Sequence, residues 1–127
     1  MLKGSCECGA VRFKLTGPMR PALACHCTQC RKTSGHYYVA TAVADADLHL
    51  YADDGLTWYQ SSAKASRGFC GKCGSSLFWH AAGSAQVSVA MGALESPTNI
   101  EVSGHIYVAD KGDYYQIDDG LPQMETR

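Results

Sequence analysis

Apolar and polar residues alternate along several short stretches of the chain, which is the pattern of strands with one buried face. Val11 to Leu15 alternate at period two, and His36 to Val43 are rich in aromatic and β-branched residues. Further strands are expected at 48–51, 56–59, 75–80, 86–90 and 105–108, with glycine-containing turns between them. A short helix at Thr28 to Ser34 is the only helical candidate. The pattern therefore predicts a mainly β protein with one short helix at most.

The length and charge of the chain indicate one domain over residues 1–127. Eleven basic and twelve acidic residues give a formal charge of -1, so no basic surface for nucleic acid is expected. No apolar run approaches the roughly 18 residues of a membrane span. The tail from Asp118, with Gly120 and Pro122, should lie irregularly over the surface. We expect no nucleic-acid or membrane partner, and a monomer or a homodimer formed through edge strands.

Seven cysteines form three tight clusters, and their arrangement favours metal binding over disulfides. The clusters are Cys6-Glu7-Cys8, Cys25-His26-Cys27-Thr28-Gln29-Cys30 and Cys70-Gly71-Lys72-Cys73. The cysteine count is odd, and no apolar segment before the first cluster indicates a signal peptide. Cysteines two or three residues apart are also poor disulfide partners but good partners around one metal ion. We therefore expect zinc sites and a reducing, cytoplasmic location.

The seven cysteines divide into four and three, which matches two kinds of zinc site. A structural zinc takes four protein ligands, whereas a catalytic zinc commonly takes three and keeps one position open. The CxC and CxxC clusters together supply four ligands, and the CxCxxC cluster supplies three. An alternative is a zinc ribbon of Cys27, Cys30, Cys70 and Cys73, which leaves the other three cysteines without a role.

Strand geometry predicts which residues inside the clusters face the metal. Alternate side chains of a strand share a face, so both sulfurs of a CxC pair would face one metal and the middle residue would turn away. His26 is such a middle residue, so we expect it to pack beside the site rather than bind the metal. Gly74, after the last cysteine, can take the positive φ that a metal-binding turn needs.

The three-cysteine cluster has the chemistry of a reactive site. Three thiolates on Zn²⁺ leave a local charge of about -1, which the adjacent Arg31 and Lys32 could balance. An incoming thiol could take the open position and would then lose its proton. The resulting thiolate is the nucleophilic form of sulfur.

Three motifs resemble those of the glutathione-dependent formaldehyde-activating enzyme family, which includes centromere protein V. They lie at residues 4–11, 25–35 and 67–79, and later landmarks at 92–94, 105–108 and 119–123 also resemble the family. The resemblance implies a β-tent fold of stacked antiparallel sheets. It implies a structural zinc on Cys6, Cys8, Cys70 and Cys73, and a second zinc on Cys25, Cys27 and Cys30.

The resemblance also implies an activity, that of a carbon–sulfur lyase that joins glutathione to formaldehyde and gives S-hydroxymethylglutathione. The thiol would enter at Cys25, Cys27 and Cys30, with Arg31 beside them. Glutathione carries two carboxylates, for which Arg31, Lys32, Arg67 and Lys111 are the candidate partners. Tyr114 stands where the family commonly has a tryptophan.

Two other functions remain open, and the metal content separates them. A zinc-stabilised binding module without catalysis would hold two zinc ions and bind no thiol. A thiol-based metal carrier or redox sensor would hold one zinc ion and keep free reactive thiols.

Overall fold

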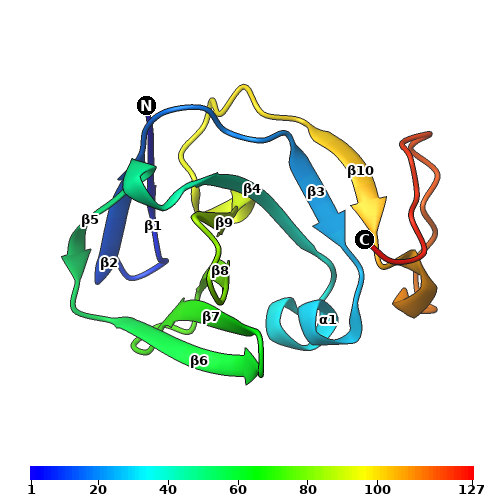
Figure 1. Cartoon of the computed structure of the whole chain (residues 1–127), viewed down its shortest axis with the longest axis horizontal. Helices are drawn as coiled ribbons and strands as arrows, with labels where there is room; N and C mark the ends of the chain where they lie inside the picture. The colour runs from blue at the N-terminus through cyan, green and yellow to red at the C-terminus, as the bar shows by residue number, and fades with distance from the viewer.

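The computed structural model describes residues 1–127, which fold into two sheets and one α-helix (Figure 1). The strands are β1 (Leu2–Ser5), β2 (Val11–Leu15), β3 (Ala22–Cys25), β4 (Tyr38–Ala44), β5 (Leu48–Asp53), β6 (Leu56–Ser62), β7 (Ala65–Cys70), β8 (Ser76–Ala81), β9 (Gln86–Ala90) and β10 (Val102–Ile106). Helix α1 spans Thr28–Ser34, and short 3-10 turns span Asp45–Asp47, Met91–Ala93 and Val108–Asp110. None of these helices has the length and apolar character needed to cross a membrane.

The first sheet is antiparallel and has three strands in the order β1-β2-β5. Its central strand β2 buries Val11, Phe13 and Leu15 completely, because every second side chain of a strand points to the same face. Gly4 of β1 lies opposite Phe13. A Cβ atom at Gly4 would come within 2.4 Å of the Phe13 ring, so the close approach of the two strands requires glycine here.

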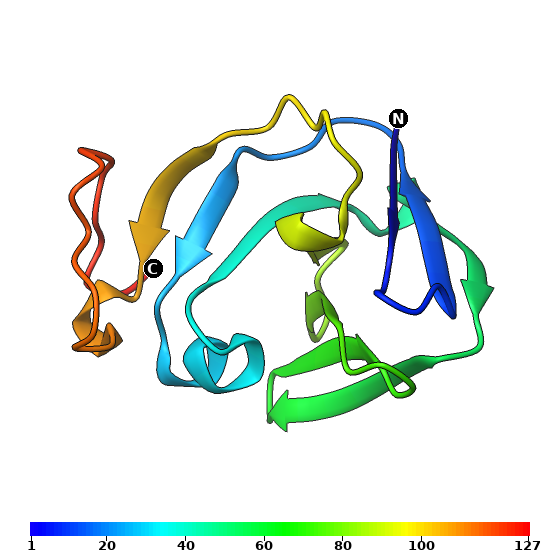
Figure 2. The ribbon, with the colours of Figure 1, turned by 180° about the vertical axis from the view of Figure 1, so that it is seen from behind.

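The second sheet has seven strands in the order β10-β3-β4-β9-β8-β7-β6. All its pairs are antiparallel except β3 and β10, which run parallel. The sheet bends strongly, so that α1 lies between the end of β3 and the β6–β7 pair (Figures 1 and 2). The Gln29 side chain of α1 donates to the Ser61 carbonyl of β6 at 3.0 Å, which joins the helix to that end of the sheet.

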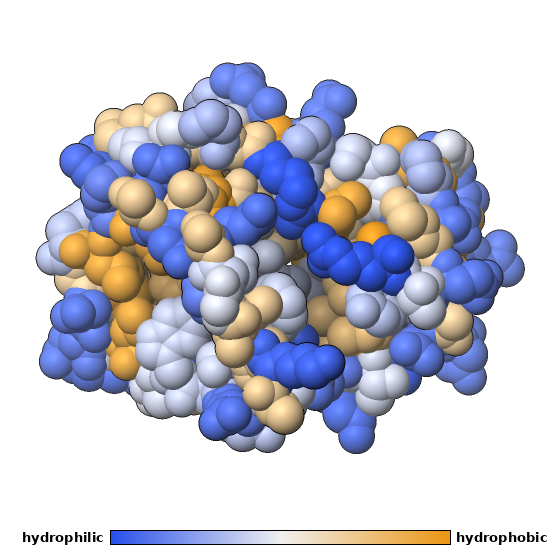
Figure 3. Space-filling model, viewed as in Figure 1, coloured by the Kyte–Doolittle hydropathy of each residue, from blue (hydrophilic) through white to orange (hydrophobic).

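The main core fills the space between the two sheets. Phe13 of β2 meets Phe78 of β8 edge to face, with ring centroids 5.0 Å apart. Buried Val43, Val87 and Val89 of β4 and β9 belong to the same cluster. A second, smaller cluster of Cys30, Tyr38, Ala40 and Ala90 packs where α1 meets β4. Polar residues cover most of the surface seen in Figure 3, with apolar patches between them.

The last residues of the chain pair with the end of β10 and with the segment that follows it. The backbone N–H groups of His105, Tyr107 and Val108 donate to carbonyls of residues 122–126 at 2.9–3.0 Å. Residues 107–108 were expected to extend the strand, but Tyr107 has a φ of 56° and a 3-10 turn begins at Val108. The tail from Asp118 contains no helix or strand, and this agrees with the expectation.

The helix and the most strongly patterned strands lie where the sequence predicts them. Helix α1 and strands β2 and β9 have the predicted bounds, and 36–43, 48–51, 56–59 and 75–80 each overlap a strand. Strands β1, β3 and β7 were not predicted. Their sequences Leu-Lys-Gly-Ser, Ala-Leu-Ala-Cys and Ala-Ser-Arg-Gly-Phe-Cys are rich in small residues and give no clear apolar alternation.

Candidate metal centres and the adjoining cavity

Four cysteines from two distant parts of the chain converge at one end of the molecule. Cys6 and Cys8 follow β1, Cys70 ends β7 and Cys73 lies in the turn before β8, and their sulfur atoms all lie within 4.8 Å of one another. The Sγ atoms of Cys6 and Cys8 are 3.7 Å apart, and those of Cys8 and Cys70 are 3.8 Å apart. A tetrahedral zinc with bonds of about 2.3 Å would place its sulfurs roughly 3.8 Å apart. The donor set therefore fits a four-coordinate zinc.

The Cys6-Glu7-Cys8 segment is a turn rather than the strand that was expected. Its two sulfurs nevertheless face one point, because Gly9 takes a φ of 83° and turns the chain back into β2. Gly74 has a φ of 84° at the equivalent place after Cys73, as predicted. Both halves of the site therefore depend on a left-handed glycine just beyond their second cysteine.

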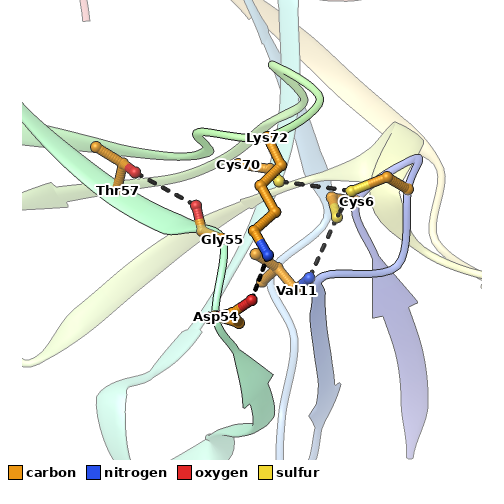
Figure 4. Close-up of polar contacts among 8 residues, drawn as sticks. Cys6, Val11, Asp54, Gly55, Thr57, Cys70 and Lys72 are labelled. Atoms are coloured by element: carbon orange, nitrogen blue, oxygen red, sulfur yellow. Dashed lines mark hydrogen bonds and ion pairs between the residues drawn. The ribbon is translucent and has the colours of Figure 1, made fainter.

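Hydrogen bonds from neighbouring residues hold these sulfurs in place. The Val11 N–H donates to the Cys6 sulfur at 3.2 Å (Figure 4). The Ser75 hydroxyl accepts from the Glu7 N–H at 3.0 Å and lies 3.3 Å from the Cys73 sulfur. Hydrogen bonding from Ser75 lowers the pKa of Cys73 to about 5, which favours the thiolate that a metal needs.

The turn between β5 and β6 closes over the Cys70 side of this site (Figure 4). The Gly71 N–H donates to the Gly55 carbonyl at 2.7 Å, and Lys72 pairs with Asp54. A Cβ atom at Gly55 would lie 2.7 Å from the Cys70 sulfur. Glycine is therefore needed at position 55 for the turn to approach the metal ligands.

Cys25, Cys27 and Cys30 form a separate group whose sulfurs also lie within 4.8 Å of one another. Cys25 ends β3, Cys27 is the N-cap of α1 and Cys30 is the buried residue of the helix. The Cys27 sulfur accepts the Cys30 N–H at 3.3 Å, which fixes two of the three sulfurs on the first turn. The grouping separates Cys27 and Cys30 from Cys70 and Cys73, so it does not support a zinc ribbon.

The electrostatics of the metal-free group favour a thiolate at Cys27 alone, because contact with the other thiols and burial raise the pKa values of Cys25 and Cys30. Hydrogen bonds with Cys25 and Cys30 lower the pKa of Cys27 far below its ordinary value. Arg67 of β7 points its Nη2 at the Cys30 sulfur at 3.5 Å, and its side chain is buried. Three thiols with a buried cation beside them are the donor set of a zinc that keeps one position free of protein ligands.

A cavity of about 450 Å³ opens beside the three cysteines, which is large enough for a small-molecule ligand. It is lined by Arg20, Leu23, Cys25, Cys27, Thr28, Gln29, Cys30, Tyr38, Ala40, Ser62, Ala65, Arg67, Trp79, Ser88, Ile106, Tyr107, Asp110 and Arg127. The Nε of Arg67 is buried without a hydrogen-bond partner. Buried polar groups normally have partners, so Arg67 keeps a hydrogen-bond donor that its protein neighbours leave unsatisfied.

The predicted cationic residues differ in their relation to this cavity. Arg67 lines it, whereas Arg31, Lys32 and Lys111 do not. Arg31 follows Cys30 on α1. Because one residue turns a helix by about 100°, the Arg31 side chain leaves the helix on a different side from Cys30, which lines the cavity. Tyr114 is 57% exposed and also lies outside the lining. The aromatic residues Tyr38 and Trp79 form part of the cavity wall, and Tyr38 is also buried.

Sequence reasoning missed Arg20, which lines the cavity from the segment before β3. Its guanidinium donates to the carbonyls of Pro21 and Ala40, at 3.0 and 3.4 Å, and this holds it at the wall. No motif surrounds Arg20 in the sequence. Its position depends on how β4 packs beside the segment that leads into β3, and no local sequence pattern predicts that packing.

His26 lies between two of the clustered cysteines but is not part of the metal-binding group, as predicted from its position. Its side chain is completely buried, packs against the Tyr37 ring and is hydrogen-bonded to two other side chains. His26 Nε2 lies 2.8 Å from His105 Nδ1, and His26 Nδ1 bonds the Tyr115 hydroxyl. His105 Nε2 lies 2.8 Å from the Asp119 carboxylate. Burial, with the neighbouring His105, lowers the pKa of His26 to about 4, so its ring is neutral at neutral pH.

Fold and site together define a class, a mainly β domain with two cysteine groups able to hold metal ions, of which one opens into a cavity. The family model for the glutathione-dependent formaldehyde-activating enzyme matches residues 1–110. The chain belongs to this family.

Individual relatives agree with this assignment at different levels. A Halomonas elongata protein named "Putative glutathione-dependent formaldehyde-activating enzyme" is 37% identical over 86 residues, which are 61% of this chain and 55% of that protein. The chain thus spans about half the length of this curated relative. A crystal structure of a Rhodobacter sphaeroides protein aligns with a TM-score of 0.61 at 22% identity, covering 95% of this chain and 98% of that one. This second likeness supports the fold alone.

Proposed function

We propose that this protein is a zinc-dependent carbon–sulfur lyase of the glutathione-dependent formaldehyde-activating type. It would add a small thiol, glutathione or a similar compound, to formaldehyde or another small aldehyde. The observation that carries the proposal is the position of Cys25, Cys27 and Cys30 on the wall of the cationic cavity. The other cysteine group does not line this cavity, and Cys6, Cys8, Cys70 and Cys73 would hold a structural zinc there.

The reaction is an addition in which all atoms are retained. The sulfur of the thiol forms a bond to the carbonyl carbon, and the proton that the thiol loses ends on the carbonyl oxygen. A zinc ion held by three cysteines supplies an open position for a thiol and favours its thiolate form. The protein contributes the binding and orientation of the thiol.

Arg67 and Arg20 are the residues proposed to bind the carboxylates of the thiol. Both line the cavity, and a guanidinium binds a carboxylate through two parallel hydrogen bonds. Arg31 and Lys32, on the helix that carries Cys30, remain predictions as further sources of positive charge at the site.

Titration of glutathione into the zinc-loaded protein tests the proposal. We expect saturable binding, and zinc-edge X-ray absorption should report a rise in the mean number of sulfur ligands per zinc. Cys27→Ser should abolish this response while the domain stays folded. Cys6→Ser should mainly unfold the domain, because the four-cysteine group joins the N-terminus to β7 and β8.

Two outcomes would contradict the proposal. Equal unfolding from both substitutions, with no response to glutathione, would exclude a catalytic three-cysteine site. A single zinc ion per chain together with free reactive thiols would instead indicate a metal carrier or redox sensor. Seven unpaired thiols suit a reducing compartment, so the cytoplasmic location stays a prediction alongside the activity.

A further inference from the structure

Four side chains connect the three-cysteine group with the C-terminal part of the chain. They are Tyr115, His26, His105 and Asp119, joined end to end by the three contacts described above. The family match ends at residue 110, so Tyr115 and Asp119 lie beyond it. The proposed reaction uses none of the four.

The hydrogen bonds of this series have one consistent direction when both rings are neutral. The Asp119 carboxylate can only accept, so His105 donates to it through Nε2–H. Neutral His105 then offers Nδ1 as an acceptor, and His26 donates to it through Nε2–H. His26 Nδ1 in turn accepts the Tyr115 hydroxyl proton. Every ring nitrogen of the two buried histidines is thereby satisfied.

The two ends of the series are anchored independently. Asp119 accepts the Leu121 N–H at 3.0 Å through its second oxygen, in a turn closed by Gly120. Lys111 donates to the backbone carbonyl of Tyr115 and lies 4.5 Å from the centre of its ring. The middle of the series is held by the backbone, because the His26 N–H donates to the Ile106 carbonyl at 3.0 Å.

His26 is the residue that joins Cys25 to Cys27, so the orientation of its ring is coupled to the path of that peptide. Cys25 is held by its pairing with Tyr38 and Ile106, and Cys27 is held at the start of α1. We propose that Tyr115, His26, His105 and Asp119 form one directional hydrogen-bonded chain that positions the Cys25–Cys27 segment and so sets the geometry of the three-cysteine metal site. The metal part of this inference rests on the proposed function; the directional chain does not.

The four residues are positioning residues, since none of them lines the cavity. Partners behind metal ligands commonly change metal affinity by about 10- to 100-fold when they are removed. Here the support acts on the backbone between two ligands rather than on a ligand itself. We expect Tyr115→Phe, which deletes only the first donor, to speed zinc loss from the three-cysteine site about tenfold. Zinc loss from the four-cysteine site should stay unchanged, which makes that site an internal reference.

Tyr114→Phe is the matched control. It removes the neighbouring hydroxyl, which lies 3.3 Å from His36 Nδ1 and takes no part in the hydrogen-bonded series of four residues. Zinc transfer to a chromophoric chelator would be followed for wild type, Tyr115→Phe and Tyr114→Phe. Faster loss of one zinc only in Tyr115→Phe supports the inference. Equal rates in the two variants would overturn it.

A second measurement tests the chain without reference to any metal. Long-range ¹H–¹⁵N NMR of the wild-type histidine rings should show Nε2 protonated and Nδ1 unprotonated in both His26 and His105. Tyr115→Phe should shift the His26 Nδ1 resonance and the amide signals of Cys25 to Cys27, and Tyr114→Phe should not. A protonated Nδ1 at either histidine would refute the directional chain. Absence of zinc at the three cysteines of the wild type would refute the proposed function instead. The NMR result would still show whether the four side chains form the directional series of hydrogen bonds.

Discussion

Replacement of Arg67 by methionine tests whether a buried cation supports the three-cysteine group. Arg67 is 8% exposed and its Nη2 lies 3.5 Å from the Cys30 sulfur. Opposite unit charges about 4 Å apart attract by roughly 4 kcal/mol at an effective dielectric constant near 20. Burying the guanidinium costs free energy in the opposite direction, and its Nε has no partner to offset that cost. A charged hydrogen bond retains about 1.5–3 kcal/mol after such costs.

That remainder corresponds to an expected loss of roughly 10- to 100-fold in zinc affinity at the three-cysteine site of Arg67→Met. Competition with a chromophoric chelator would measure the affinities of both sites in the same protein. Arg20→Met is the matched control, because Arg20 lines the same cavity but donates to backbone carbonyls. Its zinc affinity should be unchanged, although its binding of glutathione should weaken.

The stability of the metal-free protein gives a second readout of the same change. Without metal, contact with Cys27 and burial raise the pKa of Cys30, so the sulfur that the guanidinium contacts holds its proton and is not a full negative partner. Arg67→Met should therefore leave the free energy of unfolding of the metal-free protein unchanged or raise it, because a poorly compensated buried charge has been removed. Unchanged zinc affinity in Arg67→Met, or an equal loss in Arg20→Met, would refute a specific role for Arg67 at the sulfurs.

Three further changes test other parts of the structure. Gly55→Ala should weaken zinc binding at the four-cysteine site, since a Cβ would meet the Cys70 sulfur at 2.7 Å. Gly92→Ala is the control, because a Cβ there would have no atom within 4 Å. Equal zinc affinities of the two variants in a chelator competition would contradict this. Phe78→Ala should lower the free energy of unfolding by about 3–5 kcal/mol, and urea denaturation showing less than 1 kcal/mol would exclude its place in the core. The Leu121 N–H and His105 hold the pKa of Asp119 below its ordinary value, so its carboxylate stabilises the fold above about pH 4 and ceases to do so as the pH falls through the lowered pKa. The stability difference between wild type and Asp119→Asn should therefore disappear in that acid range, and a constant difference would contradict the assignment.

The sequence determined the grouping of the cysteines, because metal ligands that are two or three residues apart meet almost wherever the segment lies. Cys25, Cys27 and Cys30 come together within one loop and helix start. The separation of this trio from Cys6, Cys8, Cys70 and Cys73 also followed from counting ligands. The strongly alternating strand β2 and helix α1 were predictable for a similar reason, since their signals are periodic and local.

Only the tertiary structure decided what surrounds those sulfurs. Arg67 reaches Cys30 because β7 lies across the cavity from α1, and the pair is 37 positions apart in the chain. His26 meets His105 and Tyr115 across 79 and 89 positions, through a parallel β3–β10 pair that no sequence pattern indicated. Such contacts depend on how the sheet bends and where the C-terminal segment returns, and these are properties of the packed chain as a whole. The local spacing of the cysteines therefore determines which residues can bind the metal. The charge and the hydrogen bonds around the site arise only when distant strands are brought together.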